Sequence, residues 1–194
     1  MPYLTQEKIY QILNDRVKDD PFTLLKDLPQ PDGFKDIKKA THRILKAIKD
    51  GEKILVVGDY DVDGIVSTTI MIEFFNLLGV QIDYIIPNRF IHGYGISADL
   101  VKDIQSGIII TVDNGIGAFE AAKICKEKNI DLIITDHHTV GAQLPNAYAI
   151  VNPKQKDCTF AYKDICGAQV AWYLCAMIKK EAQLDINMME FFDI

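Results

Sequence analysis

Three aspartates spaced two residues apart, Asp59, Asp61 and Asp63, follow an apolar run in the segment VVGDYDVDG. The run before them, Ile54–Val57, is typical of a buried strand in a parallel sheet. Residues two apart on an extended chain share a face, so this spacing would direct several carboxylates toward one point past the strand. Like charges this close repel each other unless a cation neutralises them. The pattern predicts a site for a hard divalent cation such as Mg²⁺ or Mn²⁺; an ordinary polar turn is the alternative.

From residue 51 onward, short apolar strands alternate with amphipathic helices. This alternation predicts an α/β fold, a mostly parallel sheet with helices on both faces. The predicted strands are Ile54–Val57, Ile82–Ile86, Ile108–Val112, Leu132–Thr135 and Tyr148–Val151, and the predicted helices are Ile65–Leu78, Ala98–Gln105, Ala118–Lys128 and Ala168–Lys179.

Residues 1–50 differ from the rest, because their apolar residues recur at helical spacing from Leu24 to Leu28 and from Phe34 to Ile48. We therefore expect a helical N-terminal extension over residues 1–50 that packs on a main domain formed by residues 51–194.

Two further strands end on chemically active side chains. Asp113 follows Ile108–Val112, and Asp136, His137 and His138 follow Leu132–Thr135. Because parallel strands end at the same edge of a sheet, we expect these groups to join the first aspartates in one pocket. Carboxylates can bridge two cations, and two cations can activate a water and stabilise a leaving phosphate oxygen. One histidine would then bind metal while the other contacts the phosphate or moves a proton.

The bulk composition limits the partners and the compartment. The formal net charge is −6, which argues against binding nucleic acid by bulk electrostatics alone. The four cysteines form no Cys-x-x-Cys pair, which argues against a zinc cluster or a disulfide framework. The sequence shows neither a signal-peptide pattern nor an apolar run of membrane-spanning length, so we expect a cytoplasmic protein without a membrane partner.

The motifs GDYDVDG, VDNG and TDHH occur in this order, and together they resemble the DHH phosphoesterase superfamily. The segments IPNRFIHGYGIS, VNPKQKDC and CGAQVAWYL are similar to its RecJ branch in particular. The resemblance covers roughly residues 50 to 180. It implies a phosphodiesterase with two Mn²⁺ or Mg²⁺ ions that degrades single-stranded DNA from its 5′ end, in DNA repair and recombination.

The resemblance also implies roles for individual residues. Asp61, Asp63, Asp113 and His137 correspond to metal ligands, with Asp113 as the bridge between two ions. His138 corresponds to the group beside the scissile phosphate. Asp59 and Asp136 are expected to be further ligands or carboxylates that support the ligands. Arg89 is a candidate phosphate contact, because a guanidinium can hold two phosphate oxygens; a surface salt bridge is the alternative.

The superfamily's fourth motif, an aspartate beyond the helix that follows DHH, has no match before Ile194. We therefore expect an N-terminal piece of a longer protein, with DHHA1-like and oligonucleotide-binding domains as its missing partners and little nuclease activity alone.

Other functions remain open. A short-oligonucleotide phosphodiesterase or phosphatase of the same superfamily would share these motifs, and a non-catalytic scaffold would share the fold. A manganese pyrophosphatase is disfavoured because Val57 stands where its motif has histidine. A dinucleotide-binding domain is excluded because the first strand lacks a Gly-x-Gly-x-x-Gly turn.

Overall fold

The computed structural model describes residues 4–17, 27–105 and 107–194. The chain divides into two compact units, residues 1–30 and 31–194. The first unit contains helix α1 (Gln6–Val17), and the hydroxyl of Thr5 accepts a hydrogen bond from the backbone N–H of Lys8 at its start (3.2 Å). This helix agrees with the helical N-terminus expected from the sequence. Most of the expected helical stretch from Leu24 to Leu28 lies outside the described residues.

The second unit is built on a five-stranded sheet in the order β2-β1-β3-β4-β5, and every pair of neighbouring strands is parallel. The predicted α/β fold is therefore confirmed. The strands are β1 (Ile54–Val57), β2 (Asp83–Ile85), β3 (Ile108–Val112), β4 (Asp131–Thr135) and β5 (Ala149–Val151).

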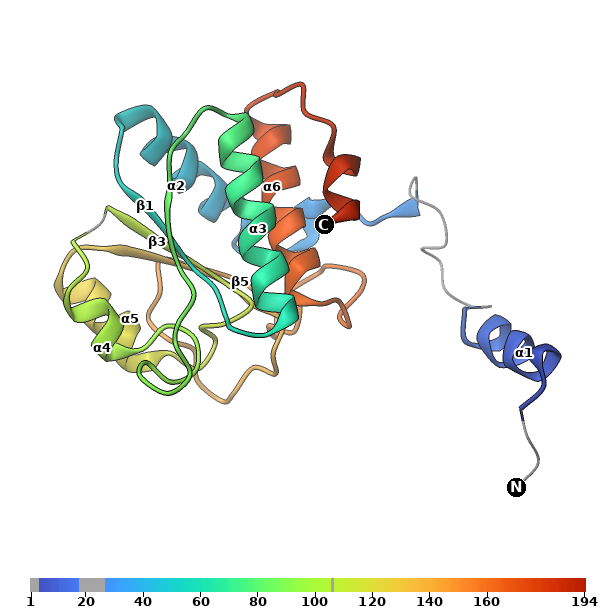
Figure 1. Ribbon diagram of the computed structural model, residues 1–194. Helices are drawn as coiled ribbons and strands as arrows, with labels where there is room; N and C mark the ends of the chain where they lie inside the picture. The colour runs from blue at the N-terminus through green and yellow to red at the C-terminus, as the bar shows by residue number, and fades with distance from the viewer. Residues whose placement is uncertain (1–3, 18–26, 106) are drawn as a thin grey trace. The chain divides into compact units, whose positions relative to one another are not determined.

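Helices cover both faces of this sheet (Figure 1). One face packs against α2 (Ile37–Asp50), α3 (Val62–Leu77) and α6 (Gly167–Glu181), and the other against α4 (Ala98–Lys102) and α5 (Phe119–Glu127). Short 3-10 turns lie at Pro31–Gly33 (η2) and Met188–Asp193 (η3). Because both faces are covered, β1, β3 and β5 are buried along their whole length, which explains why they are continuous apolar runs.

Helix α2 belongs to the core of this unit. Its residues Ile37, Ala40, Ile44 and Ala47 are buried in the same cluster as α3 and α6. The helix stops at Gly51, whose φ of 65° is left-handed and whose N–H donates to the carbonyls of the last turn. The packing expected for the second half of the N-terminal segment is thus present.

Two helix boundaries differ from the prediction by three residues, more than the others do. Helix α3 begins at Val62 rather than Ile65, because the Asp61 side chain accepts a hydrogen bond from Gly64 N–H and caps the helix (2.9 Å). Helix α4 ends at Lys102 rather than Gln105. There the Lys128 ammonium donates to the carbonyls of Val101 (3.2 Å) and Ile104 (3.0 Å), which closes the helix end.

The strand order fixes where a ligand can bind. After β1 the chain adds β2 on one side, and it then crosses back to add β3 on the other side of β1. The connections on either side of β1 therefore leave the sheet toward opposite faces, and in sheets of this kind ligands bind at the carboxyl ends of the strands at that point, here β1 and β3. Asp113 follows β3 directly, and Asp59 follows β1 after Gly58.

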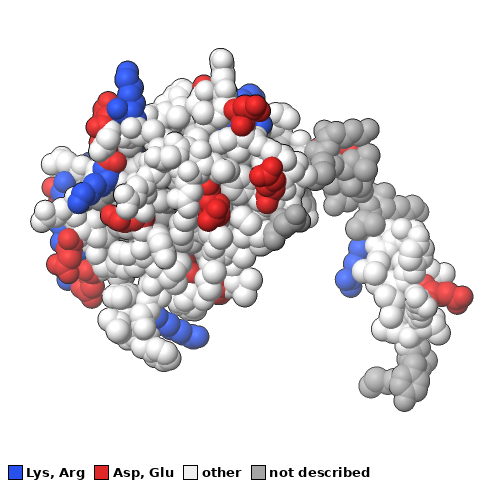
Figure 2. Space-filling view, turned by 45° about the horizontal axis from the view of Figure 1, so that its top comes forward, with Lys and Arg blue, Asp and Glu red and all other residues white. Residues whose placement is uncertain are grey.

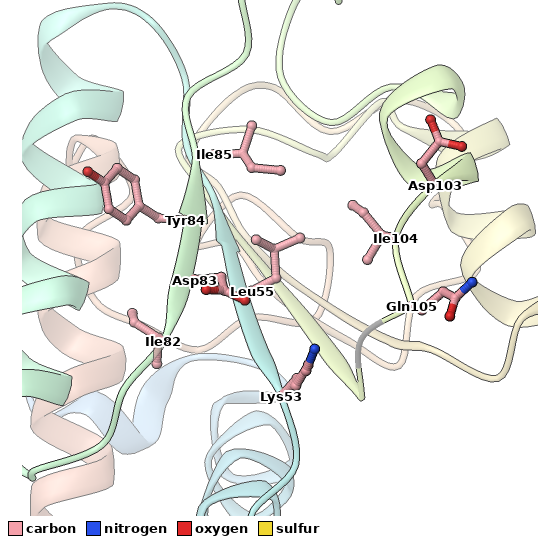
Figure 3. Close-up of a pocket in the computed structure, with 9 residues that line it drawn as sticks. All are labelled: Lys53, Leu55, Ile82, Asp83, Tyr84, Ile85, Asp103, Ile104 and Gln105. Atoms are coloured by element: carbon pink, nitrogen blue, oxygen red, sulfur yellow. The ribbon is translucent and has the colours of Figure 1, made fainter.

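A separate hollow of about 660 Å³ lies near the amino ends of β1 and β2, next to the segment that follows α4 (Figure 3). Leu55, Ile85 and Ile104 line it together with Asp83 and Asp103, and it contains no histidine. The hollow therefore lacks the strand-end acids and histidines that the sequence predicts for the site.

No helix in the described ranges is long and apolar enough to cross a membrane.

An ion-pair cluster ties α2 to the amino end of the sheet. Arg43 donates to both carboxylate oxygens of Glu52 (3.1 and 2.6 Å) and to Asp131 (2.5 Å), and its side chain is only 10% exposed. We expect Arg43→Met to lower the free energy of unfolding by about 1–2 kcal/mol, because three charge-assisted hydrogen bonds are lost. Urea denaturation measures this, with Lys46→Met as the control at an exposed pair. Equal midpoints for wild type and Arg43→Met would contradict the assignment.

Candidate metal centre

The turn between β1 and α3 carries the three aspartates that the sequence singled out. The prediction that they share one face of an extended segment is wrong, because the chain turns into a helix within the motif. Asp59 follows the strand, Asp61 is the N-cap of α3, and Asp63 lies in its first turn. Asp61 and Asp63 are stabilised there by the positive end of the helix dipole.

Asp59 and Asp113 are buried carboxylates at the ends of β1 and β3. Each residue is only 1% exposed. Among the described residues, neither oxygen of Asp59 nor Oδ1 of Asp113 accepts a hydrogen bond of normal geometry, and the nearby Tyr60 N–H lowers the pKa of Asp59 without offsetting its burial. Burial, followed by the charges of Asp63 and Asp61, raises the pKa of Asp113 to about 8. Burial and the charge of Asp61 also raise the pKa of Asp59. Unpaired buried acids of this kind are unfavourable without a cation.

Asp113 has an unusual backbone as well. Its φ of 62° is left-handed, a conformation that aspartate tolerates better than most residues. Strained backbone of this kind is concentrated at functional sites, where surrounding contacts hold it in place. Here the turn places Asp113 Oδ1 3.2 Å from His137 Nε2, just past the end of β4.

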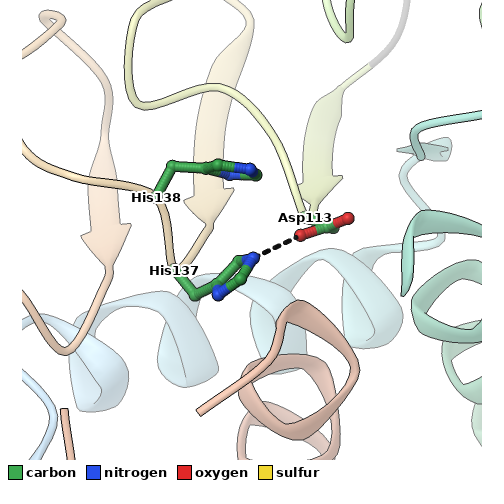
Figure 4. A group of neighbouring side chains, drawn as sticks. All are labelled: Asp113, His137 and His138. Carbon is green, nitrogen blue, oxygen red and sulfur yellow. Dashed lines mark ion pairs between the residues drawn. The ribbon is translucent and has the colours of Figure 1, made fainter. Parts of the chain in front are cut away.

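His137 is oriented to present a lone pair to the acids. Its Nδ1 lies 2.9 Å from the carbonyl oxygen of Ile165, and because a carbonyl only accepts, Nδ1 carries the proton. In the neutral ring Nε2 is then unprotonated. It lies 3.2 Å from Asp113 Oδ1 (Figure 4) and 3.5 Å from Asp63 Oδ2. A metal-binding histidine is typically fixed in this way, with its other nitrogen donating to a carbonyl.

Asp136 holds the histidine pair. Its Oδ1 accepts from the backbone N–H groups of His137 (2.7 Å) and His138 (3.0 Å) and lies 2.7 Å from His138 Nδ1. Its Oδ2 accepts from Ile116 N–H (2.9 Å). Through these hydrogen bonds Asp136 positions His138 beside the acids. His138 Nε2 is left facing the hydroxyl of Tyr94 (3.3 Å). The two histidines do leave β4 into a turn, and their ring centroids lie 4.6 Å apart.

Asp63 has a second task that the sequence did not indicate. Its two oxygens accept hydrogen bonds from the backbone N–H groups of Gly167 and Ala168, each at 2.7 Å. It thereby binds the N-terminus of α6 to the site. The approach is close, since a Cβ atom on Gly167 would collide with Asp113 Oδ1. Only glycine fits at this position.

Two groups of possible ligand atoms share Asp113. Atoms of Asp59, Asp61 and Asp113 lie within 4.8 Å of one another, and so do atoms of Asp113, His137 and His138. A carboxylate has two oxygens, so one residue can serve both groups. A group of carboxylate oxygens with an imidazole suits Mn²⁺, and a group with fewer nitrogen ligands suits Mg²⁺. The unpartnered acids and the lone pair of His137 therefore fit divalent cations.

Arg89 and two tyrosines line the approach to this centre. The Arg89 guanidinium lies over the Tyr60 ring, 5.5 Å from its centroid. Tyr60 packs edge-on against Tyr94, and Tyr94 against His138. Burial, with the charges of Asp59 and Asp136, raises the pKa of Tyr94. Arg89 forms no ion pair with any described acid, so the salt-bridge alternative finds no support there.

Charge is mixed over the face in view in Figure 2. Acidic side chains occur across its middle, and the Lys and Arg side chains that are visible stand apart from one another toward its edges. In that view, the part of the chain that the structure describes presents no continuous basic patch.

The sequence analysis missed Asn114, which is completely buried beside Asp113. Its amide nitrogen donates to the carbonyls of Val57 (3.0 Å), Gly58 (2.9 Å) and Val112 (2.9 Å), and its oxygen accepts from Ile96 N–H (3.0 Å). Asn114 thus joins the ends of β1 and β3. The motif VDNG contains it, but an asparagine before glycine is also common in turns, so the motif alone does not reveal this bridge.

We expect Asn114→Asp to lower the free energy of unfolding by about 3 kcal/mol, because a carboxylate would face three carbonyl oxygens in the core. Asn146→Asp is the matched control, since Asn146 is exposed and its change should stay within about 0.5 kcal/mol. Chemical denaturation of both variants measures the difference. A loss for Asn114→Asp no larger than that of the control would show that the bridge is dispensable.

Comparisons with known proteins agree with this geometry. Residues 53–192 match the model of the DHH family, N-terminal domain. The single-stranded-DNA-specific exonuclease RecJ of Bacillus subtilis (strain 168) is 44% identical over 151 residues, which cover 76% of this chain and 19% of that protein. The chain thus spans about a fifth of the length of this curated relative.

Solved structures give the same result. The crystal structure of an exonuclease RecJ bound to manganese matches with a TM-score of 0.72 and 30% identity, covering 78% of this chain and 39% of that one. RecJ of Thermus thermophilus in complex with Mn²⁺ matches with a TM-score of 0.67 and 28% identity, covering 78% of this chain and 22% of that one. By its sequence and its fold, this chain belongs to the DHH family.

Proposed function

We propose that this chain is the metal-binding part of a RecJ-type exonuclease that hydrolyses single-stranded DNA from its 5′ end. The observation that carries the proposal is the pair of ligand groups that share Asp113, in which buried carboxylate oxygens accept no hydrogen bond of normal geometry from the described residues. The RecJ relatives supply the substrate class, because they are single-stranded-DNA-specific exonucleases.

We assign the cation ligands to Asp59, Asp61, Asp63, Asp113 and His137, with Asp113 shared between two Mn²⁺ or Mg²⁺ ions. When bound, such ions provide the charge that activates a water nucleophile and stabilises a leaving phosphate oxygen. His137 contributes Nε2 because Ile165 fixes its tautomer. Asp63 contributes while it also holds the N-terminus of α6, which keeps that helix against the centre.

His138 and Asp136 act together in the proposal. Asp136 accepts the Nδ1 proton of His138 in a hydrogen bond, which leaves Nε2, 3.3 Å from the Tyr94 hydroxyl, as the nitrogen that faces the substrate. From there Nε2 donates a hydrogen bond or a proton to a phosphate oxygen when the ring is protonated. Arg89, held over Tyr60 at the approach, is the proposed contact for a second phosphate of the strand.

The proposal keeps the organisation expected from the sequence, a helical segment over residues 1–50 before a catalytic DHH domain over residues 51–194, with helix α2 of that segment packed in the core of the domain. The net charge of −6 leaves little bulk attraction for a polyanion. We propose that DHHA1-like and oligonucleotide-binding domains of a longer RecJ-type protein provide the other contacts that bind the DNA. A substrate panel of long single strands, dinucleotides and pyrophosphate tests this against a short-oligonucleotide phosphodiesterase, which would prefer the dinucleotides.

Cation binding should depend on pH through Asp113. Because its pKa is raised to about 8, the folded metal-free protein binds more protons than the unfolded chain between about pH 4 and pH 8. Its stability should therefore fall as the pH rises through that window. A cation that replaces the proton restores stability, so its effect should be larger at about pH 8 than at about pH 5.

Thermal denaturation with and without Mn²⁺ measures this. At a free concentration of about a hundred times Kd, we expect Mn²⁺ to raise Tm by about 5–10 °C near pH 8. Asp113→Asn should remove most of this shift and flatten the metal-free pH profile. A Mn²⁺ shift that is equal in Asp113→Asn and wild type would rule out Asp113 as the shared ligand.

Activity should depend on His138 independently of folding. In a RecJ-type protein that contains this domain, we expect His138→Asn to reduce kcat on 5′-labelled single strands by about 10²–10⁴-fold. His42→Asn is the matched control, because His42 is exposed and pairs with Glu181 at the far end of α6. Unchanged kcat in His138→Asn, or an equal loss in both variants, would contradict the assignment.

A further inference from the structure

A second hollow, of about 460 Å³, opens directly beside the metal centre, and we refer to it as the side pocket. Its walls come from the segment after β2, the turn after β3 and the end of β4. The residues that define it include Tyr94, Ile96, Ile116, Gly117, Asp136 and His138. Nothing in the proposed roles above makes use of this space.

The walls of the side pocket are mainly apolar. Ile96 is 4% exposed and packs in the smaller core cluster, and Ile116 packs against that cluster. Asp136 is the charged acid among the lining residues, but its oxygens already accept from Ile116 and from the two histidines. The Tyr94 hydroxyl likewise faces Asp113 O and His138. An isolated phosphate would find no unengaged cationic partner here, whereas a flat apolar group would be well accommodated.

The position of the side pocket links it to the metal centre. His138 lines the pocket, and its ring atoms also lie within 4.8 Å of ligand atoms of Asp113 and His137. A group covalently attached to a phosphate at the metal centre can therefore extend past His138 into the pocket. A hollow of this volume lies within the range that encloses small organic ligands.

We infer that the side pocket receives the base and sugar of the nucleotide next to the phosphate at the metal centre. This inference rests on the phosphodiesterase function proposed above. Because the side-chain walls offer mainly apolar contact, they recognise the shape of a nucleoside and not the hydrogen-bonding edge of one base. Purine and pyrimidine nucleotides therefore bind with similar affinity.

Gly117 is a suitable position for a substitution that narrows the side pocket. A Cβ atom built at this position meets no heavy atom within 4 Å, and the residue is exposed. Its φ lies outside the left-handed range, since Gly117 is absent from the residues with positive φ. Gly117→Leu thus adds bulk to the pocket without a backbone clash, and Gly117→Ala is the matched control. Gly117 belongs to neither proposed ligand group.

Calorimetric titration of this chain in Mn²⁺ tests the inference with four probes: dTMP, dAMP, 2-deoxyribose 5-phosphate and inorganic phosphate. We expect wild type to bind both nucleotides at least about tenfold more tightly than inorganic phosphate, because a base buries apolar surface in the pocket. Gly117→Leu should abolish this preference while its affinity for phosphate changes by less than about twofold. Gly117→Ala should keep the preference, and both variants should keep the wild-type Tm.

Three results would overturn the inference: no preference for nucleotides in wild type, an undiminished preference in Gly117→Leu, or no binding of any probe. Mn²⁺-dependent cleavage of single strands, assayed on the wild-type RecJ-type protein, separates this from the proposed function. Cleavage without a nucleotide preference refutes only the role inferred for the side pocket. A nucleotide preference without cleavage refutes the exonuclease assignment and leaves the binding site standing.

Discussion

The buried carboxylates at the ends of β1 and β3 are the constraint on which the rest of the site depends. Asp59 and Asp113 are each 1% exposed, and three of their four oxygens accept no hydrogen bond of normal geometry from the described residues. A fold stabilised by only about 5–15 kcal/mol retains such groups at a considerable energetic disadvantage. The raised pKa of Asp113 expresses the same conflict, since a proton partly substitutes for a missing positive charge. Divalent cations neutralise these buried carboxylates more completely than protons do.

The scaffold around these acids is built to keep them in place. Asn114 bonds to the carbonyl groups at the ends of both strands, and Asp136 accepts hydrogen bonds from the loop that carries the histidines. Asp63 fixes the N-terminus of α6. These contacts converge on a region that the strand order already leaves open. The strand order therefore places the acids at one edge of the sheet, and buried hydrogen bonds then hold them in position.

The sequence predicted the fold and the converging residues better than it predicted their local conformation. The predicted strand positions were accurate because buried parallel strands are continuous apolar runs. The prediction that the acids lie together at one edge followed from the parallel arrangement of these strands. The conformation of the Asp59–Asp63 segment was wrong, because Asp61 caps a helix that the spacing alone presented as extended chain. The roles of Asn114 and of Asp63 at α6 depend on tertiary contacts between distant segments, and no local pattern encodes them.

Anomalous scattering from crystals soaked in Mn²⁺ is the most direct test of the central claim, that cations neutralise the acids around Asp113. The account predicts manganese peaks within coordination distance of the Asp113 carboxylate, on the sides that face Asp61 and His137. Peaks confined to surface carboxylates, with ordered Asp59 and Asp113 and no manganese between them at saturating metal, would contradict it.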